Sequence, residues 1–208
     1  MFRFAVLALL LTLLISGCTG TDGSTPAATS LPGLPAQPTS TSTSATSKPK
    51  AAPDYEKLLI TADDLSDAED TFHQQSAQSQ PDGMPGASAF FVNDEDTRAI
   101  STVVLIYPNA ATAAATLQQA QATLPSLVAG GTPQPIPVGN GGIVVRGAKP
   151  AEDKSVTLMF FTVDRALVRL EFQSAIGDPT TDQFVTNVGK MQAIALRTGL
   201  ATALPAPR

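Results

Sequence analysis

Apolar and polar positions divide this chain of 208 residues into three parts with different patterns. An almost unbroken apolar run extends from Phe4 to Ile15. From Thr19 to Pro53 the residues are mostly Ser, Thr, Pro, Ala and Gly, and bulky side chains are nearly absent. The residues that follow, about 54–199, show the period-two and helical spacings of strands and helices. We therefore predict one folded body that begins after a long polar segment.

The first half of the body predicts a hairpin. Residues 88–93 and 97–107 are rich in Val, Ile, Phe and Thr, and they flank the acidic turn sequence NDED. Upstream, the sequence PDGMPG is a turn signal, and a strand through Phe72 is expected to lead into it.

The second half predicts a central pair of strands. Residues 155–163 are apolar on both faces, which is typical of a strand covered on both sides. Residues 166–173 alternate, so that Arg169, Glu171 and Gln173 are expected on an exposed face, and Asp164 with Arg165 forms the turn between the strands. Two shorter strands are expected in the sequences PIPVG and GIVVRG, separated by a tight turn at GNGG.

Two helices are predicted before these strands. Thr61, with Asp64 three residues later, is a capping-box variant that begins a short helix. Asn109 caps a longer helix, which Pro125 should end or kink. Apolar residues at helical spacing predict its buried face: Leu117, Ala120, Leu124, Leu127 and Val128.

The last helix is expected to begin with Asp178 as its cap and Pro179 in its first turn, and to stop at Gly199. Its predicted buried stripe is Phe184, Val188, Met191 and Ala195. From the order of these elements we predict an α+β fold, with a mainly antiparallel sheet of five or six strands packed by two long helices.

The predicted organisation has four parts. Residues 1–17 are a signal peptide, 18–53 a disordered tether, 54–199 a single α+β domain and 200–208 a flexible tail. The tether cannot bury enough apolar surface to offset the entropy of ordering it. As a flexible chain its ends would lie about 30 Å apart, and as a polyproline-like chain it would reach roughly 100 Å, so it is a spacer.

Net charge excludes one class of partner. The sequence has 13 basic and 18 acidic side chains, a formal charge of -5. Removal of the first seventeen residues takes Arg3 with it and leaves -6. Nucleic-acid binding depends on clustered Lys and Arg, so we do not expect nucleic acid as a partner.

The only cysteine, Cys18, follows the apolar run. Arg3 precedes the run and small residues follow it, as in an export signal. Its twelve residues would span roughly 18 Å as a helix, against a hydrocarbon core of about 30 Å, so the run is too short for a permanent anchor. The thiol has no partner for an intramolecular disulfide. The simplest alternative is a plain secretory signal that ends by chance in cysteine.

Leu14, Ile15, Ser16, Gly17 and Cys18 resemble the cleavage motif of bacterial lipoprotein precursors, with Ile where Leu is commoner. The resemblance implies cleavage between Gly17 and Cys18 and attachment of diacylglycerol, with acyl chains such as palmitate, to the Cys18 thiol. Two or more acyl chains, at about 0.8 kcal/mol per buried methylene, hold a protein stably on a membrane. With its linker, the chain is similar to actinobacterial cell-envelope lipoproteins of uncharacterised function. The implied location is the extracytoplasmic face of the cell membrane.

The residues that carry most enzyme chemistry are scarce. His73 is the only histidine, and no Gly-x-Ser-x-Gly sequence accompanies it. One histidine and a lipidated cysteine leave only carboxylates as zinc ligands. We interpret His73 as a polar strand or loop residue and predict no catalytic residues, no metal and no cofactor.

Charged clusters in the body have simple structural interpretations. Seven carboxylates lie between Asp54 and Asp70, but without the spacing of a calcium loop, and NDEDTR, which ends in Arg98, predicts a solvated turn. GNGG precedes a strand and not a helix, which argues against a phosphate loop. Internal ion pairs, or alternatively an anionic partner, would use the basic residues Arg146, Lys149, Lys154, Arg165 and Arg169.

Together these patterns predict a lipid-anchored envelope protein with a non-catalytic body that binds a small apolar ligand or an envelope protein. The sequence indicates no ligand-binding residue. Two alternatives stay open. An envelope hydrolase using carboxylates would need an acid with a raised pKa in a cleft. An accessory subunit docking on a membrane complex would need an exposed apolar patch.

Overall fold

The computed structural model describes residues 53–203. The predicted signal peptide, the lipidated Cys18, the tether up to residue 52 and residues 204–208 lie outside the described residues.

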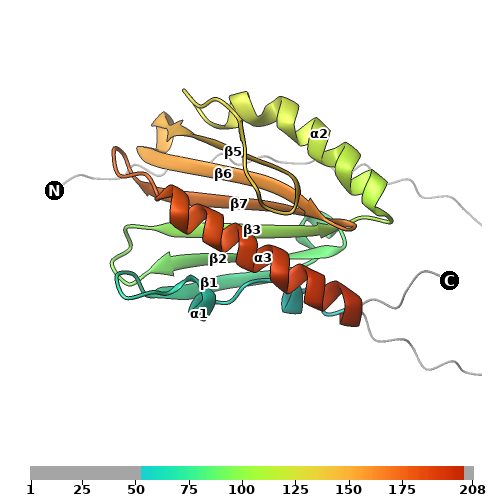
Figure 1. The fold of residues 1–208 in the computed structure, drawn as a ribbon. Helices are drawn as coiled ribbons and strands as arrows, with labels where there is room; N and C mark the ends of the chain where they lie inside the picture. Colours follow the sequence, from blue (N-terminus) through green and yellow to red (C-terminus); the bar gives the residue numbers. More distant parts are fainter. Residues whose placement is uncertain (1–52, 204–208) are drawn as a thin grey trace, which may run out of the picture. The chain divides into compact units, whose positions relative to one another are not determined.

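Within this range the chain forms one antiparallel sheet of seven strands with helices on both faces (Figure 1). The strands are β1 (Phe72–Ser79), β2 (Gly86–Asn93), β3 (Ala99–Ile106), β4 (Gln134–Pro135), β5 (Asn140–Lys149), β6 (Lys154–Val163) and β7 (Ala166–Ala175). The α-helices are α1 (Ala62–Leu65), α2 (Ala110–Leu127) and α3 (Asp182–Ala203), and the single turns of 3-10 helix are η1 (Glu56–Leu58), η2 (Pro81–Gly83) and η3 (Pro150–Glu152).

The strands lie in the order β1-β2-β3-β7-β6-β5-β4. This confirms the predicted α+β class, the antiparallel sheet and the two long helices. The sheet has seven strands instead of five or six, because β1 is a full strand although it is mostly polar, and because β4 adds a two-residue strand at the opposite edge.

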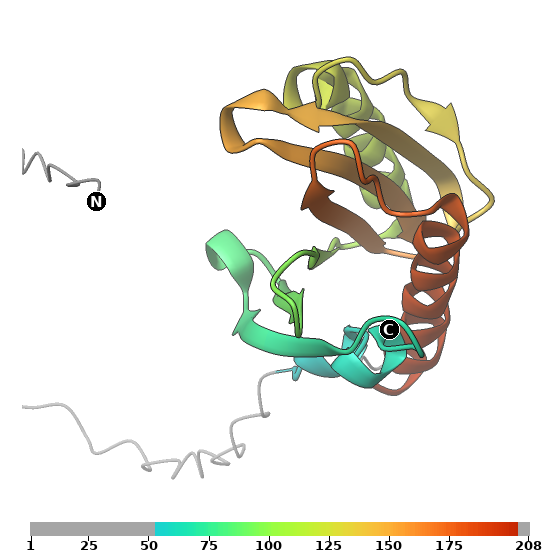
Figure 2. The same cartoon turned by 90° about the vertical axis from the view of Figure 1, so that its left-hand side faces the viewer.

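The two long helices cover opposite faces of the sheet. Alternate residues of β6 explain this, since Met159 and Phe161 belong to the core under α3, whereas Leu158 and Phe160 belong to a smaller cluster under α2. Every residue of β6 from Ser155 to Val163 is buried, as predicted for a strand covered on both sides. Figure 2 shows the sheet curving towards α3.

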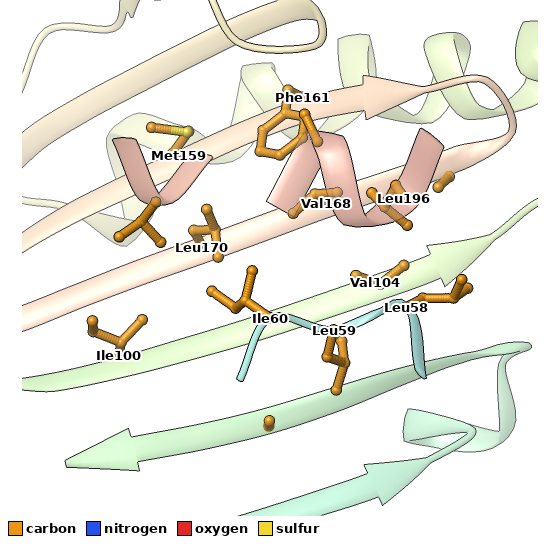
Figure 3. Packing of buried hydrophobic residues seen from close by; sticks show 14 of the residues in the cluster. Leu58, Leu59, Ile60, Ile100, Val104, Met159, Phe161, Val168, Leu170 and Leu196 are labelled. Carbon is orange, nitrogen blue, oxygen red and sulfur yellow. The ribbon is translucent and has the colours of Figure 1, made fainter. Parts of the chain in front are cut away.

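The larger core lies between the sheet, α3 and the segment around η1. Leu58, Leu59 and Ile60 pack over the sheet beside Val104 of β3 and Leu196 of α3 (Figure 3). At about 25 cal/mol for each Å² of apolar surface removed from water, burial of such large side chains is the main stabilising contribution. The N-terminal segment of the domain is therefore part of the core and not an appendage.

A buried amide joins the same three parts. Gln192 of α3 has no exposed surface, and its Nε2 donates to the carbonyl oxygen of Leu58 at 2.7 Å. Its Oε1 accepts from the main-chain N–H of Ile60 at 3.2 Å and from the Thr102 hydroxyl at 3.3 Å. The amide thus satisfies the main-chain groups of Leu58 and Ile60, which packing against β3 and α3 would otherwise bury without partners.

Half of the second sheet face carries no helix. The helix α2 packs mainly on β5, β6 and β7. Over β2 and β3 the side chains on that face include Phe90, which is 36% exposed, and the half-buried Val92, Val103 and Leu105. We call this surface the open face.

Local signals at turns and caps were confirmed. Thr61 and Asp64 form the predicted capping box, and the Asn109 side chain accepts from the Thr112 N–H at the start of α2. The β2–β3 turn is held by the buried Asn93, whose Oδ1 accepts from the N–H groups of Thr97 and Arg98. Asn93 caps this turn by the same local chemistry that makes asparagine common in turns.

The predicted ends of α3 were wrong. The helix begins at Asp182, where the Thr181 hydroxyl accepts the Phe184 N–H, and Asp178 pairs with Arg98 instead of capping the helix. It continues past Gly199 to Ala203. A Cβ on Gly199 would lie 2.5 Å from Leu58 Cδ2, so this glycine permits close packing of α3 on η1 and does not stop the helix.

The buried sides of both long helices differ in part from the predicted stripes. In α2, Leu117, Leu124 and the adjoining Val128 are buried, but Leu127 is 43% exposed. Pro125 lies in the last turn, where two residues follow it before the helix ends. In α3, Val188 is buried as predicted, while Phe184, Met191 and Ala195 are only half-buried. The fully buried positions there are Val185, Val188, Gln192 and Leu196.

Two strand predictions were also wrong. The sequence GNGG does not separate two strands, since residues 140–142 begin β5, with an irregularity in register between Asn140 and Ile143. Glu171 of β7 is 4% exposed instead of solvent-facing, because neighbouring charged side chains cover it. Asp164, with φ of 50°, does form the two-residue turn between β6 and β7.

Among residues 53–203 no helix is both long and apolar enough to cross a membrane.

Candidate ligand site

A cavity of about 110 Å³ lies at one end of the sheet, under the start of α3. Here β1 and β3 begin and β7 ends, so three segments that are distant in the sequence meet. This end of the sheet lies at the left of Figure 1 and faces the viewer in Figure 2. One wall is aromatic and the mouth is charged.

The aromatic wall consists of three phenyl rings. Phe72 of β1 and Phe172 of β7 are 3% and 1% exposed, and Phe184 in the first turn of α3 is half-buried. The Phe184 ring stacks on Phe72 at a centroid distance of 6.1 Å and meets Phe172 edge-on at 6.3 Å. Such pairs fix the ring orientations beyond what burial alone would do, so this wall is preformed.

The loop between α1 and β1 supplies carboxylates at the mouth. Asp67 Oδ1 accepts from the N–H groups of Glu69 and Asp70 at 2.8 and 2.9 Å. The hydrogen bonds from Asp70 and Glu69 lower the pKa of Asp67 against a small opposing effect of burial. Ser66 anchors the loop by accepting the Phe72 N–H at 2.9 Å. Asp67, Glu69 and Asp70 all line the cavity.

Arg98 lies at the opposite side of the mouth and is already paired. Its Nε lies 3.3 Å from Asp70 Oδ2, and its Nη2 donates to Asp178 Oδ2 at 2.8 Å. Asn93 donates to the other oxygen of Asp70 at 2.7 Å. These contacts connect the residues before β1, the β2–β3 turn and the loop before α3. Ion pairs and a hydrogen bond therefore hold the three segments of the mouth together.

The cavity continues into a wider and shallower depression of about 340 Å³ along α3. Asp67 and Phe184 line both hollows, and Met191 extends the apolar surface along the helix. A ligand in the cavity therefore has room to extend along the half-buried side of α3.

His73 lies on the open face and not in this site. It is exposed on β1 and pairs with Asp94 of the β2–β3 turn, beside a shallow depression that also includes Phe90. This confirms its interpretation as a polar strand residue. Within residues 53–203 there is no group of three or more His, Cys, Asp or Glu side chains arranged to hold a metal ion.

The nearly buried Glu171 belongs to a separate cluster. Burial raises its pKa, but hydrogen bonds from Lys149 and Gln173 and the charges of Arg169 and Lys149 outweigh this and lower it. Lys149 donates to Glu171 at 2.6 Å, and the Arg169 guanidinium also pairs with it. Two of the basic residues singled out from the sequence thus form internal ion pairs, and so does Arg146, which lies 2.6 Å from Asp182.

The sequence-predicted site residues, Gly17 and Cys18, lie outside the described residues. The acidic segment 54–70 does contribute to the site through Asp67, Glu69 and Asp70. Sequence reasoning missed Phe72, Phe172 and Phe184. Only their shared aromatic character singles them out, and no spacing indicates that residues about a hundred positions apart would meet.

Comparisons with known proteins bear on the fold. No protein-family model matches the chain, and no curated protein sequence matches it. Among solved structures, the extracellular domain of PknH from Mycobacterium tuberculosis is similar, with a TM-score of 0.50 and 11% sequence identity. The similarity covers 69% of this chain and 95% of that domain. At this identity the likeness shows a shared fold.

Proposed function

We propose that the chain is a lipid-anchored cell-envelope protein whose body binds a small ligand without transforming it. The anchor is the acylated Cys18, on the extracytoplasmic face of the cell membrane. The body binds an apolar group of the ligand in the cavity beside Phe184. The protein acts as a carrier or binding module, and the tether carries its body away from the membrane surface.

The observation that carries this proposal is the preformed aromatic cavity. Ligand sites in proteins are concave, mostly apolar and provided with a few polar groups that fix orientation. Here two buried rings support a third, half-buried ring, and hydroxyl and charged side chains surround the opening. An engineered apolar cavity of about 150 Å³ takes up benzene, so 110 Å³ with an open side suits a small alkyl or aryl group.

The shared fold supports the location. The similar PknH domain is extracellular and comes from a mycobacterium, which agrees with an actinobacterial envelope protein. No residue of that domain is carried over to this chain.

The chemistry of the body favours binding over hydrolysis. A carboxylate hydrolase would need an acid held protonated in a cleft. Glu171, the best-buried carboxylate of residues 53–203, has a lowered pKa and is paired with Lys149 and Arg169. Asp67 at the cavity mouth also has a lowered pKa. Both therefore favour the ionised form.

The test is native mass spectrometry of the protein extracted from its own host. We expect lipid on the N-terminal peptide, lost in Cys18→Ser, and a non-covalent mass on the body. That mass should be lost in Phe184→Ala and kept in Ile194→Ala, a matched control because Ile194 is 58% exposed on the same helix. Thermal unfolding checks that Phe184→Ala is folded.

Each part of the proposal fails separately. Absence of lipid from the native protein would mean that it is secreted without a lipid anchor. A bound mass that survives Phe184→Ala would move the ligand to another surface. A body without any bound mass in several preparations would favour the docking alternative, for which the open face around Phe90 is the surface to crosslink.

A further inference from the structure

We infer that the cavity selects ligands that carry a positive charge next to their apolar group, such as a primary ammonium attached to an aryl or alkyl chain. This inference rests on the proposed binding function and adds the chemical class of the ligand. It follows from which charges at the mouth are already neutralised and which are not.

Two carboxylates at the mouth have no cation of their own. Across residues 53–203, neither Asp67 nor Glu69 has an ion-pair partner, and both are lining residues. The third carboxylate, Asp70, is paired with Arg98. A ligand entering the cavity therefore meets uncompensated negative charge.

Among the described residues, Arg98 is the only cation that lines the cavity itself, while the exposed Lys190 lines the neighbouring depression. Arg98 already contacts both Asp70 and Asp178. A carboxylate or phosphate would have to displace one of them while lying close to Asp67 and Glu69, and like charges brought together disfavour binding. At the start of α3 the Thr181 hydroxyl accepts the Phe184 N–H at 3.4 Å, so this N–H is already occupied.

The aromatic wall points to the organic part of the ligand and is independent of the carboxylates. A cation placed over a phenyl face is attracted by the ring quadrupole, most strongly where water is excluded. Phe184 is the accessible ring, and it lines both the cavity and the neighbouring depression. An ammonium group at the mouth can thus contact carboxylates while its apolar carbon atoms lie against Phe184.

The charge of Asp67 persists under mildly acid conditions. The main-chain N–H groups of Asp70 and Glu69 donate to its carboxylate and lower its pKa. Lowering the pH towards 5 should therefore leave the contribution of Asp67 to the affinity for an ammonium ligand unchanged.

Three probes of similar shape separate charge from shape: benzylammonium, benzyl alcohol and benzoate. Each is titrated into the mature chain, and main-chain amide signals of residues 67–72 and 181–184 are followed by NMR. We expect benzylammonium to bind most tightly and benzoate most weakly. Added salt should weaken binding of the ammonium and leave the alcohol unaffected.

The variant Asp67→Asn with Glu69→Gln removes the two unpaired charges and keeps their shape. An asparagine Oδ1 can still accept the two main-chain N–H groups, so the loop is preserved. We expect affinity for benzylammonium to fall by about three- to tenfold, as for two partly exposed charge contacts, and affinity for benzyl alcohol to stay the same. The matched control is Asp63→Asn with Glu95→Gln, which neutralises two exposed carboxylates outside the cavity.

The outcomes distinguish the two proposals. Equal or tighter binding of the alcohol or of benzoate, with shifts at the cavity, would overturn the cationic class and keep the site. An equal loss of ammonium affinity in the control pair would mean that only the overall charge matters, and would also overturn it. No shifts at the cavity with any probe at millimolar concentration would refute binding at the cavity itself.

Discussion

Replacement of Gln192 by leucine tests whether the buried amide stabilises the domain. The side chain has no exposed surface and makes three hydrogen bonds, to Leu58, Ile60 and Thr102. Leucine has a similar size and would be favoured by burial alone. The substitution therefore sets hydrogen bonding directly against the hydrophobic effect.

The expected cost follows from the groups left without partners. The carbonyl of Leu58 and the N–H of Ile60 would stay buried and unsatisfied, at about 1–3 kcal/mol each. Extra apolar burial by leucine returns about 1–2 kcal/mol. The midpoints of the two ranges differ by about 2.5 kcal/mol, which is the net loss that we expect in the free energy of unfolding.

Urea unfolding of the mature chain, followed by circular dichroism, measures this loss. The midpoint should fall while the slope with urea concentration stays constant, because the surface exposed on unfolding hardly changes. Gln183→Leu is the control on the same helix, since Gln183 is exposed, and it should change stability by at most about 0.5 kcal/mol. A Gln192→Leu variant as stable as the wild type would refute the reasoning, because relaxation or entering water would then satisfy the two main-chain groups.

Three further substitutions test other features of the domain. Glu171 has a lowered pKa in the folded state, so its contribution to stability is present above its unfolded pKa of about 4.3 and lost as the pH falls through the folded value. Stability of Glu171→Gln, measured by urea unfolding from pH 7 to 3, should therefore be lower at pH 7 and fall less steeply below pH 4. Gly199→Ala gains about 1 kcal/mol of helix propensity, but the added Cβ would lie 2.5 Å from a buried Leu58 methyl. We therefore expect a melting temperature below that of the wild type. An increase in melting temperature would contradict the packing role of Gly199. Asn93→Ala removes the acceptor for two turn N–H groups and should cost about 1–3 kcal/mol in chemical unfolding, whereas an unchanged midpoint would show that water replaces the side chain.

Features that depend on neighbours in the sequence were predictable. The capping box at Thr61 needs only Asp64, and the turn at Asn93 needs only the next few residues. The central position of β6 was predictable for a similar reason, because a strand covered on both faces must be apolar at successive positions. Each of these properties depends on residues that lie close together in the sequence.

Features that depend on distant contacts were not predictable. Glycine commonly ends helices, and only the position of Leu58 in the fold shows that Gly199 instead permits close packing. Glu171 alternates with apolar residues as an exposed side chain would, yet Lys149, on a strand that is not its neighbour, helps to bury and neutralise it. Gln192 likewise has the polar side chain of a typical surface residue, and its hydrogen-bond partners Ile60, Leu58 and Thr102 lie 132, 134 and 90 positions away in the sequence.

The same distinction separates the two halves of the proposed function. An export and lipidation signal is recognised in a chain that has not yet folded, so its information must lie in consecutive residues, as in the motif proposed around Cys18. A ligand cavity exists only after folding, and this one combines Phe72, Phe172 and Phe184 with a loop that precedes β1. Each of these residues alone has an ordinary explanation as a core or loop side chain. The proposed location is therefore of a kind that a sequence pattern can reveal, whereas the proposed ligand chemistry depends on the distances between segments that only the fold brings together.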